Sequence, residues 1–130
     1  MNWGKITKYA AALFVAQVSI GFVSAAWSPV DITSGVTLLA ASSAASFLVS
    51  GAIFAHLAIN QSTKAFAHAW AALVLQAVAA AVLWQLLARL AGSTPSLLIV
   101  LEWLVLAGAL LVGTSLGISR RGRPGQSADA

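Results

Sequence analysis

Glu102 is the residue with the clearest capacity for chemistry, because it is the only acidic side chain inside an apolar stretch of this sequence. Arg89 and Gln85 lie near the end of the preceding apolar stretch, so the three side chains could meet near one membrane boundary. Ionisable side chains within a membrane are costly and are often functional. In a functional site, Glu102 would carry a proton or a cation, and Arg89 would be the partner that adjusts the affinity of Glu102. We favour a structural Arg89–Glu102 pair, because both side chains can reach water at this shallow depth.

Two amides, those of Gln17 and Gln76, lie near the middle of their apolar stretches. A hydrogen bond between such groups on neighbouring membrane helices contributes about 0.6 to 2 kcal/mol. We therefore expect Gln17 and Gln76 to be structural, bonded to each other or to a serine of the second stretch. A polar transport path is the alternative interpretation.

His56 and His68 flank the link around Lys64, each about one helical turn inside its apolar stretch. Two opposed histidines can hold a haem or a metal ion, yet hydrogen bonds to the backbone of the link are more common. We expect no cofactor and no metal. The chain has no cysteine, which excludes disulfides and thiolate sites. The sequence also has no nucleophile–base motif and no phosphate-binding loop, so we expect no enzymatic activity.

The elements that must position these residues are four apolar stretches, at about 9–27, 36–59, 66–88 and 97–118. A membrane-spanning helix needs roughly 20 apolar residues. The chain is 60% hydrophobic and 8% charged, with a mean hydropathy of +0.92, whereas a soluble domain has about 25% charged residues. The pattern predicts an all-α membrane protein. Residues 1–118 would form one domain, a four-transmembrane-helix antiparallel bundle, and 119–130 a disordered basic tail.

Basic residues gather on one side of the predicted membrane. Arg89 lies on the other side from the remaining six, which are Lys5, Lys8, Lys64, Arg120, Arg121 and Arg123. The positive-inside rule then places both termini in the cytoplasm, for a multi-pass protein of a bacterial inner membrane. The net charge of +4 forms no basic stripe with interleaved aromatic residues. We therefore expect contact with the lipid bilayer and none with nucleic acid.

The first apolar stretch permits a second interpretation. Two lysines, the apolar run after them and the small residues around Ser24 resemble a signal peptide with a cleavage site. Gln17 interrupts that run, and the apolar character continues to Trp27. We therefore expect an uncleaved first span; cleavage would leave three spans in the same orientation.

Small residues recur at helical spacing in the second and fourth stretches. Ser42, Ser46 and Ser50 follow one another at intervals of four, and Gly113 and Gly117 form a GxxxG pattern. Such faces let helix backbones approach closely in lipid. They serve either a partner protein, a second copy or packing within the bundle, and we favour packing within the bundle.

These features favour an accessory or assembly subunit of a membrane complex, which acts through helix–helix contacts with a partner or with itself. In size and number of spans the chain also resembles the small multidrug resistance family, which implies a small dimeric exporter. That family relies on a glutamate in its first span, where this sequence has Gln17. Because an amide cannot exchange a proton, Glu102 would have to take this part. A holin-like or immunity-type membrane protein is a further alternative.

Overall fold

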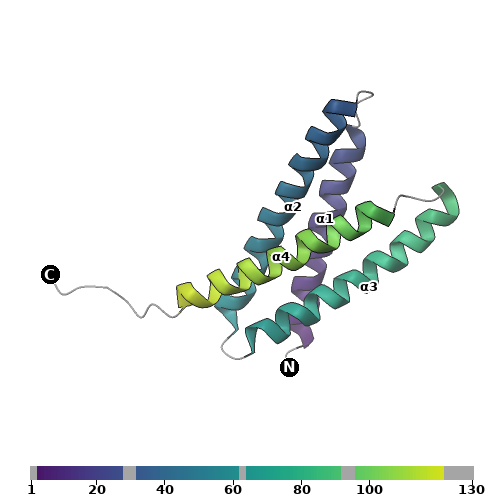
Figure 1. Ribbon diagram of the computed structural model, residues 1–130. Helices are drawn as coiled ribbons and strands as arrows, with labels where there is room; N and C mark the ends of the chain where they lie inside the picture. Colours follow the sequence, from purple (N-terminus) through teal and green to yellow (C-terminus); the bar gives the residue numbers. More distant parts are fainter. Residues whose placement is uncertain (1–2, 28–31, 62–63, 92–95, 122–130) are drawn as a thin grey trace, which may run out of the picture.

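The protein folds into four α-helices in the parts of the chain that its computed structural model describes, residues 3–27, 32–61, 64–91 and 96–121. They are α1 (Trp3–Ala26), α2 (Ile32–Asn60), α3 (Ala65–Ala91) and α4 (Ser96–Arg121) (Figure 1). Each is long and apolar enough to cross a membrane. Even α1, with 24 residues, is about 36 Å long, against about 30 Å for the hydrocarbon core of a bilayer. The fold is therefore all-α and compatible with a small membrane protein.

The helices extend beyond the predicted apolar stretches. α1 begins at Trp3, where the Thr7 hydroxyl donates a hydrogen bond of 2.9 Å to the Trp3 carbonyl. α4 continues to Arg121, so residues 119–121 of the predicted disordered tail are helical, and the rest of that tail lies outside the described residues. Hydropathy marks only the part of a helix that suits lipid, whereas backbone hydrogen bonding carries the helix onward into the interface.

α1 and α2 run in opposite directions along each other. Tyr9, near the start of α1, contacts His56 near the end of α2. Farther along α1, Gln17 bonds to Ser50 and Ser46, which precede His56 in the chain. Residue numbers therefore rise along one helix as they fall along the other.

The most extensive contact joins α2 and α4, which are not consecutive in the chain. Gly113 faces Gly51, and Gly117 faces Ala55, so these two helices run in the same direction. A Cβ atom at either α4 glycine would lie within 3.0 Å of the α2 backbone, closer than real Cβ atoms come. Only glycine permits this approach, and Figure 1 shows α4 crossing α2 obliquely at the contact. The GxxxG pattern of α4 is thus used within the chain.

The buried core lies toward one end of the molecule. Its larger cluster consists of Leu13, Phe54, Leu57, Ala69, Leu73, Leu106 and Leu110. We call this the closed end; it holds the start of α1, the end of α4 and the link between α2 and α3. At the opposite end, which we call the open end, the α1–α2 pair diverges from the α3–α4 pair (Figure 1). The pockets at Glu102, described next, are lined by residues of α1, α2 and α4 on one side and of α3 and α4 on the other.

Candidate polar site between the helices

Gln17 joins α1 to α2 through both ends of its amide. Its Nε2 donates to the Ser50 hydroxyl at 2.9 Å, and its Oε1 accepts from the Ser46 hydroxyl at 2.8 Å. Both serines are buried. Two of the three serines at intervals of four therefore hold α1, while the Ser42 hydroxyl donates to the Leu39 carbonyl of its own helix at 3.0 Å.

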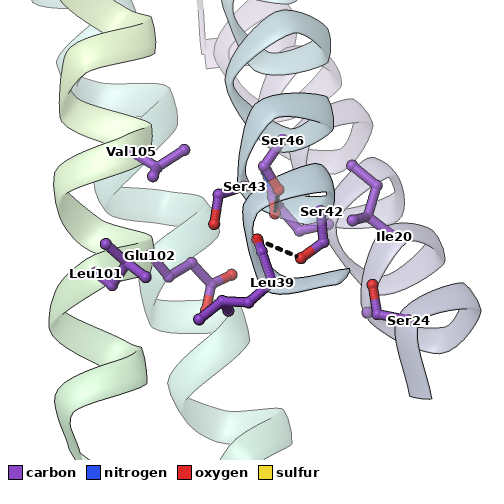
Figure 2. Close-up of a pocket in the computed structure, with 11 residues that line it drawn as sticks. Ile20, Ser24, Leu39, Ser42, Ser43, Ser46, Leu101, Glu102 and Val105 are labelled. Atoms are coloured by element: carbon purple, nitrogen blue, oxygen red, sulfur yellow. Dashed lines mark hydrogen bonds between the residues drawn. The ribbon is translucent and has the colours of Figure 1, made fainter. Parts of the chain in front are cut away.

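Glu102 projects from α4 toward α2, as Figure 2 shows. It lines a pocket of about 200 Å³ between α1, α2 and α4. The Ser43 hydroxyl points into the same space, and Gln17 and Ser46 form part of the pocket wall. None of the described residues forms a hydrogen bond or an ion pair with Glu102. The carboxyl group thus shares its pocket with serine hydroxyls, the Gln17 amide and apolar side chains such as Leu39, and it has no counter-charge among the described residues.

A second pocket lies on the other side of Glu102, between α3 and α4. Its volume is about 280 Å³, and its wall includes Gln76, Trp84 and Trp103. The Gln76 side chain is 3% exposed, and its Oε1 has no hydrogen-bond partner among the described residues. Glu102 therefore stands between two pockets, one lined by hydroxyl groups and one by indole rings and an unpaired amide oxygen.

Arg89 and Gln85 lie elsewhere. Both line a separate pocket with Val82 and Leu86 of α3, and no ion pair joins Arg89 to Glu102. The expected Arg89–Glu102 pair and its neighbour Gln85 are thus not brought together. About two and a half helical turns separate Gln85 from Gln76, so the two amides project from opposite sides of α3. The expected pairing of Arg89 with Glu102 was based on their depth in the membrane. It did not consider the side of α3 from which Arg89 projects.

The sequence did not predict that Gln76, Trp84 and Trp103 lie in one pocket with Glu102. Gln76, Ala80 and Trp84 follow one another at intervals of four, which places them on one face of α3. That face was detectable in the sequence. Its contact with α4 was not, because an apolar helix has no preferred side in lipid.

The two histidines have different surroundings. The His56 Nδ1 and the Tyr9 hydroxyl share a hydrogen bond of 2.8 Å, and the Asn60 amide lies 3.2 Å from His56 Nε2. His68 is buried, with its Nδ1 3.0 Å from the Lys64 carbonyl oxygen. Among the described residues, no three His, Cys, Asp or Glu side chains gather as metal ligands would.

Basic residues from distant parts of the chain meet at the closed end. The Arg121 guanidinium donates a hydrogen bond to the Gln61 carbonyl, which brings the end of α4 to the link before α3. Lys64 adopts a left-handed conformation in that link, with φ of 54°. Lys8 lines a pocket with His56 at the same end. Lys8, Lys64 and Arg121 therefore share one end of the molecule.

Comparison with known proteins found no matching family model, no matching curated protein and no matching solved structure. The class of protein therefore rests on its own four apolar helices, which are compatible with a small membrane protein. Its function must be inferred from the Glu102 site.

Proposed function

We propose that the protein is a multi-pass protein of the bacterial inner membrane that binds a small cationic solute at Glu102, as a small transporter does. Its four helices cross the bilayer as an antiparallel bundle with both termini in the cytoplasm. The alternating directions of the helices support this topology, as does the grouping of Lys8, Lys64 and Arg121 at the closed end. Anionic lipid attracts such a group to the cytoplasmic face.

The observation that carries the cation proposal is the Glu102 carboxylate without a counter-charge. A charge in membrane surroundings is stable only when water, a proton or an opposite charge compensates it. Serine hydroxyls of α2 line the pocket on one side, and Trp84 and Trp103 line the pocket on the other. Indole rings attract cations. An organic cation or a proton is the ligand that fits these groups.

The asymmetry of the bundle supports movement of that ligand. The buried core lies toward the closed end, and the two helix pairs diverge at the open end (Figure 1). The Glu102 pockets lie toward the open end, with Ser24 and Leu39 in the wall of one of them. A transporter exposes its site to one side of the membrane at a time. We infer that ligand reaches Glu102 from the open end, which is the outer end in the proposed topology.

The experiment measures the binding of tetraphenylphosphonium, an organic cation, to the purified protein in detergent. We expect saturable binding that Glu102→Gln weakens by about tenfold or more, because the substitution removes the only charge in the site and keeps its shape. Arg89→Gln is the matched control: it also changes one charge at the open end, but outside these two pockets. Equal affinity in Glu102→Gln and the unchanged protein would remove Glu102 from the mechanism, and no saturable binding to either would refute an organic-cation site.

An accessory or assembly subunit is the second candidate, favoured by the large apolar surface that the four helices leave uncovered. Val15, Val18 and Phe22 of α1 are exposed, with Phe22 75% exposed. Because Gly113 and Gly117 are occupied within the chain, a partner protein or a second copy would contact other faces such as this one. The mass and composition of the particle extracted in mild detergent distinguish the candidates: a reproducible heteromeric complex supports the subunit, and a monomer or homodimer the transporter.

A further inference from the structure

A second pocket system lies at the closed end, on the surface formed by α1 and α2, away from Glu102. This groove has a volume of about 450 Å³. Lys8, Tyr9 and His56 lie along it near the ends of their helices, and Ala12, Val49 and Ile53 line the rest. Ala12 is one turn deeper than Lys8, and Val49 about two turns deeper than His56. The groove therefore passes from a polar, basic rim to an apolar floor along the direction of the helices.

One hydrogen bond between the two helices and one within α2 hold the rim in place. The Tyr9 hydroxyl and His56 Nδ1 are 2.8 Å apart, and the Asn60 amide donates to the His56 carbonyl at 2.9 Å. When His56 carries its proton on Nδ1, it donates to Tyr9, and the Tyr9 hydroxyl can donate outward to an acceptor. No described residue forms an ion pair with Lys8, whose ammonium group supplies further donors.

The charges around the rim favour an anion. Glu102 is the only acidic side chain among the described residues, and it lines the pockets that lie toward the open end. The closed end presents Lys8, Lys64 and Arg121 with no carboxylate among the described residues to balance them. A phosphate accepts hydrogen bonds from such donors, and basic pockets between membrane helices on the cytoplasmic side bind anionic lipid headgroups. The apolar floor suits an acyl chain and gives a free phosphate no contact.

We propose that this groove binds an anionic phospholipid, with its phosphate at Lys8, Tyr9 and His56 and an acyl chain against Ala12, Val49 and Ile53. The lipid joins α1 to α2 at the cytoplasmic boundary. The cytoplasmic placement rests on the topology proposed above. The site itself uses none of the residues that line the Glu102 pockets, so a failure of cation binding at Glu102 would leave the lipid proposal standing.

The test is native mass spectrometry of the full chain, titrated with dioleoylphosphatidylglycerol or with dioleoylphosphatidylcholine of equal chain length. We expect preferential binding of phosphatidylglycerol. Lys8→Gln should weaken it about fivefold, the effect of one basic residue at an anionic surface. Tyr9→Phe, which removes one hydroxyl and keeps the ring, should also weaken phosphatidylglycerol binding and leave phosphatidylcholine binding unchanged.

Arg89→Gln and Glu102→Gln are the controls, because both residues lie outside the groove, and neither should change lipid binding. Equal affinity for the two lipids, or no change in Lys8→Gln and Tyr9→Phe, would overturn the proposal. Competition separates the sources of phosphate: millimolar inorganic phosphate should not displace the lipid. If it does, the site is a phosphate site and the assignment of the acyl chain is wrong.

Discussion

At the scale of single residues, hydrogen bonding separates the polar side chains that hold the bundle from those that are available to a ligand. The Gln17 amide is bonded at both ends, to Ser50 and Ser46. The Gln76 Oε1 is buried and has no partner among the described residues, and Glu102 has no counter-charge there. Gln17 is thus bonded to two serines of α2 and not to Gln76. Gln76 and Glu102 retain unused bonding capacity between α3 and α4.

The contribution of the Gln17 hydrogen bonds to the free energy of unfolding can be measured. Gln17→Leu removes both hydrogen bonds and leaves the buried Ser46 and Ser50 hydroxyls without this partner. We expect a loss of about 1 kcal/mol in the free energy of unfolding, the magnitude of such bonds between membrane helices. Unfolding by sodium dodecyl sulfate in mixed micelles measures it. Gln85→Leu, at an exposed position of α3, should have no effect; a loss as large as that of Gln17→Leu would show that the two bonds contribute nothing specific.

At the scale of elements, the α2–α4 contact determines the packing of the four helices. Consecutive helices contact one another, but the most extensive contact joins two helices separated by a third. Backbone atoms of Gly51 and Ala55 lie where side chains of α4 would stand. In lipid, where apolar burial gives no advantage, this close backbone approach supplies dispersion contacts along the interface.

Two glycine substitutions distinguish close packing from helix propensity. Gly113→Ala places a Cβ atom against the Gly51 backbone, which cannot move aside cheaply, so we expect destabilisation by about 1–3 kcal/mol, as for other overpacked cores. Gly21→Ala meets nothing within 4 Å and should be neutral or stabilising by up to about 1 kcal/mol. Thermal unfolding of both variants in detergent gives the comparison. A Gly113→Ala protein as stable as Gly21→Ala would show that the two backbones are farther apart than described.

At the scale of the whole molecule, the difference between the two ends links topology to function. The closed end carries basic residues from α1, α4 and the α2–α3 link, and the Glu102 pockets lie toward the open end. If the closed end is cytoplasmic, the Glu102 pockets lie on the outer side of the buried core. The orientation of the basic end would then also decide which side of the membrane the Glu102 pockets face.

Cysteine labelling tests this orientation, because the chain has no native cysteine. Thr33→Cys lies at the start of α2 on the open end, and Ser119→Cys lies near the end of α4 on the closed end; both positions are exposed. A membrane-impermeant maleimide should label Thr33→Cys in intact spheroplasts and Ser119→Cys only after permeabilisation. The reverse pattern would invert the proposed topology, and labelling of both from outside would place the two ends on one side of the membrane.

The sequence by itself determined that the protein is all-α and that four helices are long enough to span a membrane. It also predicted that Lys8, Lys64 and Arg121 lie at the same end of the molecule. Helices form through hydrogen bonds between residues near in sequence, and the shortage of polar side chains identifies the surrounding solvent, so both are local properties. Residues 119–121 were expected to be disordered, because hydropathy does not detect a helix that continues into the interface.

The tertiary structure alone decided which faces meet. It brought Glu102 to serines of α2 and to Gln76, and it left Arg89 on another face of α3. The four helices are apolar on nearly every side, so their hydrophobic periodicity contains almost no information about direction. The choice of partner then depends on contacts between distant residues, such as Gly113 against Gly51, whose energy depends on shape.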